Sequence, residues 1–159
     1  MPGVRDAQLY HLAERADRVR ALAEARRAVR PGGMVAAVTI NRHAGVHDTV
    51  RAGSYVDERQ RETVHAAVRD GHLVSPGRGF PAYFHDPDEV PGEFADAGLP
   101  GAERYGLEGA FWLYGDVEGW LDDPERRRLL LDAQRSMESV PSLLGVGGHL
   151  LTVATAETP

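Results

Sequence analysis

Between residues 12 and 30, apolar positions recur every three or four residues, and this spacing predicts an amphipathic helix. The Pro-Gly-Gly at 31–33 ends this helix, because proline cannot continue it and glycine permits a reversal of the chain. Residues 34–40, MVAAVTI, are apolar on both faces, which is typical of a strand in the middle of a sheet. The predicted buried face of the helix comprises Leu12, Ala16, Val19, Leu22, Ala23 and Val29.

Residues 41–80 are rich in Gly, His, Asp and Arg, and the turn signals HAGVHD, RDGH and SPGRG interrupt them. Within this region, the segment VDERQRETVHAAVRD can form a helix through Val56, Val64 and Val68. We therefore interpret residues 44–82 as a helical cap inserted into one domain that extends over 1–159.

The alternation of elements resumes at Tyr83. Residues 86–98 predict a helix with Asp86 as its N-cap and Gly98 at its end. Residues 102–114 predict a strand broken at a glycine, and a helix capped by Asp122 or Asp123 follows it. The segment GHLLTVAT closes the chain as a strand, so the order of elements predicts an α/β fold. The predicted buried stripe of the last helix comprises Leu129, Leu130, Ala133 and Met137.

Composition narrows the class of function. The net charge of −6 disfavours nucleic acid as a partner. The absence of cysteine excludes disulfides, a thiolate nucleophile and a cysteine-based metal site. No apolar run approaches the length needed to span a membrane, and the first residues lack a hydrophobic signal core, so we expect a cytoplasmic protein.

Several segments resemble one family. The stretch LYHLAERADRVRALAEARRAVRPGGMVAAVTINRHA is similar to the middle of class I S-adenosylmethionine-dependent methyltransferases, with their tyrosine-histidine turn, helix, RPGG and fifth strand. The segments YFHDPDEV, FADAGL, DPERR and HLLTVA resemble later parts of a bacterial small-molecule group of that family. The resemblance implies a partial Rossmann-like sheet made of the later strands and helices, and methyl transfer from S-adenosylmethionine to a small-molecule acceptor.

The family's glycine-rich GxGxG loop and its ribose-binding acidic residue have no counterpart in this sequence. In the family, the fifth strand pairs with the fourth and with the last. We therefore expect residues 34–40 to leave one edge unpaired, which would recruit a second copy or a companion chain, or mark a gene remnant. The missing loop favours an alternative function, a non-catalytic methyltransferase-derived binding or partner subunit.

The resemblance also implies roles for individual residues. It places the turn at residues 10–12 against cofactor and substrate, and residues 83–85 at the border of the substrate pocket. Histidine suits proton transfer near neutral pH. Arg42 follows the strand, where open α/β sheets bind ligands. The resulting candidates are His11 and His85 for catalysis, Tyr10 and Leu12 for the cofactor, and Arg42, Tyr83 and Trp112 for the substrate.

These residues also have plain structural interpretations. His11 could cap the following helix, Arg42 could bridge to a carboxylate at a helix cap, and Trp112 could belong to the core. A competing zinc hypothesis uses His43, His47, Asp48 and His65, but no HExxH motif is present and we assign no metal. Ser54 lacks the GxSxG setting of a nucleophile.

Overall fold

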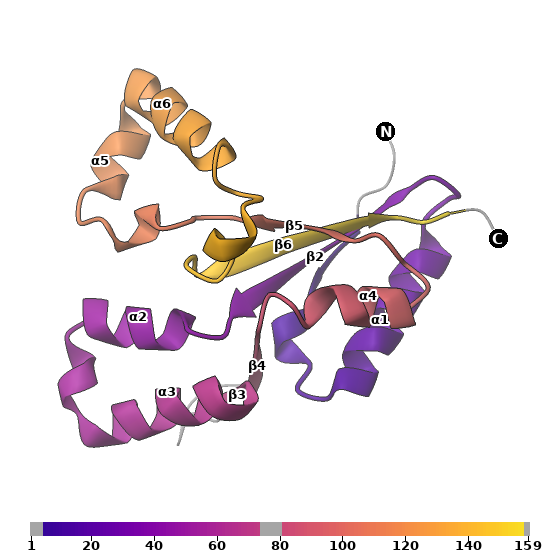
Figure 1. The fold of residues 1–159 in the computed structure, drawn as a ribbon, viewed down its shortest axis with the longest axis horizontal. Helices are drawn as coiled ribbons and strands as arrows, with labels where there is room; N and C mark the ends of the chain where they lie inside the picture. The colour runs from indigo at the N-terminus through magenta and orange to yellow at the C-terminus, as the bar shows by residue number, and fades with distance from the viewer. Residues whose placement is uncertain (1–4, 74–80, 158–159) are drawn as a thin grey trace.

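A computed structural model describes residues 5–73 and 81–157, and it confirms the mixed α/β fold expected from the sequence (Figure 1). The described residues contain a six-stranded sheet with the path β3-β4-β2-β6-β5, and β1 also pairs with β2. The strands are β1 (Arg5–Gln8), β2 (Met34–Asn41), β3 (His72–Leu73), β4 (Ala82–His85), β5 (Glu103–Gly106) and β6 (His149–Thr155).

Helices lie in three groups around this sheet (Figure 1). Helices α1 and α4 lie together, α2 and α3 form a pair beyond the end of β2, and α5 and α6 form a hairpin that stands away from the other helices. The helices are α1 (Arg15–Ala28), α2 (Ala44–Arg51), α3 (Glu58–Asp70), α4 (Val90–Asp96), α5 (Val117–Asp122) and α6 (Pro124–Arg135). Short 3₁₀ turns are η1 (Leu9–His11), η2 (Ser54–Val56), η3 (Phe111–Leu113) and η4 (Pro141–Leu143).

Strand β2 lies at the centre of the sheet, and both of its edges are paired. Strand β6 runs antiparallel to it from Met34↔Thr155 to Ile40↔His149. On the other edge, β1 pairs in parallel with residues 35–38 and β4 pairs in parallel with residues 40–41. Strand β1 therefore occupies the edge that we expected to be unpaired, and the expectation of a free edge at residues 35–38 is wrong. The expectation of a second copy or a companion chain stays a prediction.

The strand that occupies this edge of β2 is β1, and the hydrophobic pattern of the sequence does not predict it. Residues 5–8 read RDAQ, with no apolar alternation of the kind that identifies a strand. Their strand conformation comes from backbone pairing with the apolar residues 35–38. Pairing with a distant segment is a tertiary effect that a local pattern cannot report.

The hydrophobic core lies where α1 and α4 pack against the sheet. Helix α1 confirms the predicted helix, although it begins at Arg15, and Leu22 is fully buried as expected. Ala16 and Ala23 are exposed, whereas Arg18 is buried. The core cluster comprises Leu9, Leu22, Val35, Ala37, Val90, Phe94, Ala97, Leu99, Leu144, Leu150, Ala154 and Ala156.

The region predicted as a cap contains more regular structure than its sequence suggests. Helix α3 confirms the helix predicted there, and α2 occupies residues 44–51, where the turn signal HAGVHD had indicated a break in regular structure. Gly45 allows α2 to approach β4, because a Cβ at this position would lie 3.2 Å from the ring of Phe84. The SPGRG turn signal lies outside the described residues.

Two further predicted elements differ from those observed. Helix α4 begins at Val90 and not at Asp86, because the Asp86 carboxylate accepts a hydrogen bond from the Asp88 backbone in a turn (3.0 Å). The predicted strand 102–114 ends at Gly106, and Trp112 lies in the 3₁₀ turn η3.

The last helix confirms the predicted N-cap and part of the predicted buried stripe, since Leu130, Ala133 and Met137 are half-buried. The Asp123 side chain accepts hydrogen bonds from the backbone of residues 125 and 126. Leu129 is exposed, and the buried residue of α6 is Gln134, whose Nε2 donates to the Gly106 carbonyl (2.6 Å). Helix α6 is therefore tied to the end of β5 by a polar contact.

Candidate functional site

Three parallel strands end at the same edge of the sheet. Strands β1, β2 and β4 end at Gln8, Asn41 and His85, and the segments that follow them meet at this edge. Open α/β sheets bind ligands outside the carboxyl ends of their strands. This edge is therefore the candidate functional site.

A buried ion pair lies beneath the site. The Arg18 Nε donates to Oε1 of Glu93 (2.9 Å), and both side chains are only 2% exposed. The other Glu93 oxygen lies 3.4 Å from Nε2 of His85, which is fully buried. Arg18 also donates to the carbonyls of Leu12 (2.9 Å) and Ala13 (2.6 Å). The cluster thus connects the loop after η1 to α4 and β4.

The electrostatic balance of this cluster keeps Glu93 ionised. Burial alone would raise the pKa of the Glu93 carboxyl, but the contacts with His85 and Arg18 outweigh burial and lower this pKa. Arg18 is thereby matched by a carboxylate, as a buried guanidinium requires.

Tyr83 lies between two guanidinium groups. The Arg18 Cζ is 3.8 Å from the centroid of the Tyr83 ring, and the Arg42 Cζ is 5.6 Å from it. The Tyr83 hydroxyl donates to Oε2 of Glu89 (3.2 Å). Burial first, and then the charge of Glu89, raise the pKa of the Tyr83 phenol. Tyr83 therefore stays protonated and can act as a hydrogen-bond donor.

Arg42 bridges to a carboxylate at a helix cap, as its plain structural interpretation predicted. Its Nε donates to the Phe84 carbonyl (2.7 Å), and its terminal nitrogen donates to the Glu89 carboxylate (2.8 and 2.9 Å). Glu89 is the N-cap residue of α4, so Arg42 bridges the end of β2 to a helix cap. Its terminal nitrogen also lies 3.3 Å from the Tyr83 hydroxyl.

The structure brings most of the sequence-predicted residues into one neighbourhood. Turn η1 packs against β4, which places Tyr10 and His11 near Tyr83 and His85. The Tyr10 and His11 rings are in contact, with centroids 4.3 Å apart, and His11 is exposed. A cavity of about 280 Å³ opens here; it is lined by Ala13, Glu14, Arg15, Arg18, His72, Tyr83, Glu89 and Glu93.

Trp112 lies apart from this group, in a second cavity of about 230 Å³ beside the end of β2. Its indole Nε1 donates to the Val146 carbonyl (3.2 Å). The Asn41 amide donates to the carbonyls of Leu144 (3.0 Å) and Gly147 (2.7 Å), and these bonds fix the loop that leads into β6. The cavity is lined by Ile40, Ala44, Gly45, Asp48, Phe84, Glu108, Trp112, Gly148 and His149.

A carboxylate–imidazole pair forms one wall of this second cavity. The Glu108 Oε1 lies 2.6 Å from Nδ1 of His149, and Oε2 accepts from the His149 backbone N–H (2.8 Å). The hydrogen bond with Glu108 raises the pKa of the His149 imidazole. Burial would raise the pKa of the Glu108 carboxyl, but its bonds with His149 outweigh burial and lower this pKa. With 41% of its side chain exposed, His149 is accessible to a ligand.

The sequence analysis identified neither Glu108 nor His149 as a site residue. What brings the two residues together is the register of β5 and β6, which pair antiparallel with Gly106 opposite Leu150. Glu108 follows the end of β5 and therefore lies next to His149, the first residue of β6. The sequence could have identified the pair only if the pairing of these strands had been known.

The zinc hypothesis gains no support from the part of the chain that the structure describes. Within residues 5–73 and 81–157, no group of three His, Asp or Glu side chains could hold a metal ion. His65 instead lies 2.8 Å from the Tyr55 hydroxyl. In the same described segments, no helix is long and apolar enough to cross a membrane.

Comparison with known proteins gives structural neighbours but no sequence relatives. No protein-family model and no curated protein matches this chain. One similar structure is a SAM-dependent methyltransferase from Methanosarcina mazei, with 13% identity and a TM-score of 0.49 over 98% of this chain and 58% of that chain.

Two other structures have comparable similarity. The complex of the Haloferax volcanii Trm112 methyltransferase activator with a candidate methyltransferase matches at 20% identity and a TM-score of 0.47, over 98% of this chain and 53% of that chain. The CcbJ methyltransferase from Streptomyces caelestis matches at 15% identity and a TM-score of 0.45, over 98% of this chain and 56% of that chain. The present chain spans slightly more than half the length of each neighbour.

Proposed function

We propose that this chain forms the later part of a class I S-adenosylmethionine-dependent methyltransferase domain that acts on a small-molecule acceptor. The sequence resemblance to that family motivates the proposal. The observation that carries it is the pairing of β2, which lies between the parallel strand β1 and the antiparallel strand β6. The resemblance requires this arrangement, because the family's fifth strand lies between its fourth and its last.

The motif residues support the same assignment. The tyrosine-histidine turn falls on η1, directly after β1, and the RPGG segment falls on the turn between α1 and β2. Tyr10 is half-buried at the ligand-binding edge of the sheet, where it could contact a cofactor. Leu12 is also half-buried, and its carbonyl is held by Arg18.

The residues of this chain do not form a complete cofactor pocket. The sequence contains neither the glycine-rich loop nor the ribose-binding acid, which supply most of the cofactor contacts in the family. We therefore assign to η1 a partial cofactor contact and derive no chemical step from the cofactor.

The second cavity is the proposed site of the acceptor's reacting group. Glu108 holds His149 through Nδ1, which leaves Nε2 as the nitrogen that accepts a proton from an acceptor hydroxyl. His85 is fully buried against Glu93 and so suits a positioning role, while the exposed His11 stays a candidate for catalysis. Trp112 and the first residues of α2, Ala44 and Gly45, line the same cavity.

The test is an NMR titration of the ¹⁵N-labelled chain with S-adenosylhomocysteine, the demethylated product. An incomplete pocket binds weakly, so we expect saturable shifts at millimolar concentration, confined to residues 9–12 and 41–45. The variant Tyr10→Ala should lose these shifts. Tyr55→Ala, which alters a half-buried tyrosine in η2, should keep them.

The proposal fails if the folded chain shows no saturable shift at η1. It also fails if Tyr10→Ala and Tyr55→Ala behave alike, because the binding would then not involve the family's tyrosine turn.

A further inference from the structure

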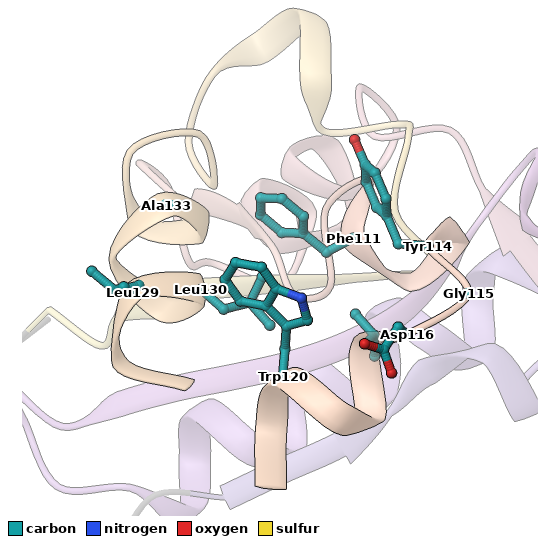
Figure 2. Close-up of a pocket in the computed structure, with 9 residues that line it drawn as sticks. Phe111, Tyr114, Gly115, Asp116, Trp120, Leu129, Leu130 and Ala133 are labelled. Atoms are coloured by element: carbon teal, nitrogen blue, oxygen red, sulfur yellow. The ribbon is translucent and has the colours of Figure 1, made fainter. Parts of the chain in front are cut away.

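The hairpin of α5 and α6 encloses a pocket of about 610 Å³ (Figure 2). In the close-up, the indole of Trp120 and the ring of Phe111 lie beside the segment of α6 that carries Leu130 and Ala133. Most of the lining is apolar, and the aromatic residues come from η3, α5 and the segment between them. The lining residues are Phe111, Tyr114, Gly115, Asp116, Val117, Trp120, Leu129, Leu130 and Ala133.

Several of these apolar side chains are exposed to solvent. Trp120 is 40% exposed, Leu129 47% and Tyr114 65%. Helices α5 and α6 pack mainly against each other, and Figure 1 shows the hairpin standing away from α1 and α4. Concentrated exposed apolar surface of this kind marks a binding site more often than a structural need.

The pocket adjoins the candidate functional site through an intervening cavity of about 210 Å³. This intervening cavity shares Glu108 and Trp112 with the cavity at His149. It shares Phe111, Val117 and Leu130 with the pocket of Figure 2. Neighbouring cavities with shared walls therefore extend from the end of β2 to the α5–α6 hairpin.

We propose that the α5–α6 pocket binds the apolar, ring-bearing body of the methyl acceptor while the acceptor's reacting group lies at His149. This assignment rests on the function proposed above and names its substrate class. The volume falls within the range of about 300–1,000 Å³ that is typical of small-molecule sites. Flat aromatic side chains such as Trp120 and Phe111 stack favourably on ring systems.

The charge of the residues that line the pocket gives a preference between cationic and anionic ligands. Of the described residues that line it, Asp116 is the one with a charge. An acceptor with a basic amine should therefore bind more tightly than an anionic molecule of the same shape. Asp116 is exposed, and the Arg126 guanidinium lies 5.8 Å from the Trp120 ring, so this preference is modest and decreases with salt.

The experiment follows the two tryptophan indole N–H signals in ¹⁵N NMR spectra of the intact chain. The probes are 1-naphthylmethylamine, which is a cation at neutral pH, and 1-naphthylacetate, an anion with the same ring and methylene spacer. We expect saturable shifts of the Trp120 indole with both probes, and about threefold tighter binding of the cation. This readout requires neither cofactor nor methyl transfer.

Variants on the two helices locate the binding. Ala133→Phe fills the pocket from α6 and should weaken probe binding about tenfold or more. Arg127→Phe adds the same ring on an exposed part of α6 that does not line the pocket, and it should leave binding unchanged. Asp116→Asn should remove the preference for the cation.

Three outcomes would overturn the inference. The first is the absence of any saturable Trp120 shift, and the second is equal probe binding by Ala133→Phe and Arg127→Phe. The third is a dimer in sedimentation equilibrium that Ala133→Phe dissociates, because a second copy would then occupy the pocket. The function proposed above would survive each outcome if S-adenosylhomocysteine still shifts η1.

Discussion

Arg18 departs furthest from the amphipathic pattern of its helix. The spacing of apolar residues assigns arginines to the solvent-facing side of α1, yet Arg18 is buried against Glu93 and Tyr83. A guanidinium can be buried when a carboxylate and backbone carbonyls satisfy its donors, as Glu93, Leu12 and Ala13 do here. Burial of a charged residue depends on partners distant in sequence, which a helical pattern does not contain.

The buried pair gives a prediction about stability. Glu93→Gln keeps the shape of the side chain but leaves Arg18 as an unmatched buried charge, which costs about 3–5 kcal/mol of unfolding free energy. Urea unfolding followed by circular dichroism measures this loss. Glu24→Gln removes an exposed partner of Arg27 and should have no measurable effect. Equal unfolding midpoints for the two variants would contradict the prediction.

The Glu108–His149 pair gives a prediction about pH. The folded pKa of His149 is raised above its usual 6.5, so its stabilising contribution is complete below that value and is lost as pH rises through the folded pKa. The folded pKa of Glu108 is lowered, so its contribution is present above its usual 4.5 and is lost as pH falls through the folded pKa. The pair therefore stabilises most between pH 4.5 and 6.5.

Glu108→Gln should lower the pKa of His149, because the neutral amide no longer favours the imidazolium. An NMR titration of the histidine ring protons, with His149 identified by substitution, measures the change. Asp70→Asn alters the exposed partner of His72 and should leave the His149 titration unaffected. An unchanged pKa of His149 in Glu108→Gln would show that the pair does not form in solution.

At the scale of elements, the clearest local signals identified α1, β2, α3 and β6. They have strong internal patterns, such as the apolar run of residues 34–40, and clear local signals for their ends, such as the Pro-Gly-Gly at 31–33. The elements that the sequence did not identify are short: β1, α2, β3, β4 and α5. Short elements hold too few residues for a periodic signal and depend on the neighbours against which they pair.

The junction of α3 and β3 gives a prediction at this scale. Gly71 ends α3 with a φ of +83°, and a Cβ there would lie 2.6 Å from the Tyr83 ring and 2.9 Å from the Phe84 carbonyl. Gly53 also has a positive φ, of +71°, but nothing lies within 4 Å of its Cβ position. The two glycines differ in crowding and share the left-handed conformation.

Gly53→Ala should cost about 1 kcal/mol for the backbone conformation. Gly71→Ala should cost about 1–3 kcal/mol more, because Tyr83 and the β4 backbone must also shift. Denaturation midpoints of the two variants give the difference directly. A similar loss in both would mean that the contact between α3 and β4 is looser than described.

At the scale of the whole molecule, the packing between elements differs from one region to another. Strand β2 contacts strands on both edges and α1 on its face, while α5 and α6 pack mainly against each other. Regions with few buried apolar contacts open locally at a lower free energy than the core. The α5–α6 hairpin should therefore open independently of the sheet.

Native-state hydrogen exchange tests this expectation. Amides of α5 and α6 should exchange at a free energy well below that of global unfolding, whereas amides of β2 and β6 should approach the global value. A pocket ligand such as 1-naphthylmethylamine should slow exchange in the hairpin alone. Uniform protection across all these elements would contradict this difference in packing.

The sequence by itself determined the α/β character, the helix–turn–strand unit around residues 12–41, the closing strand and the helix cap at Asp123. These features arise from residues adjacent along the chain. Tertiary structure decided the pairing of β1 with β2, the burial of Arg18 and the contact between Glu108 and His149. The physical reason is that backbone pairing and charge burial depend on the residues that folding brings into contact, and these lie far apart in the sequence.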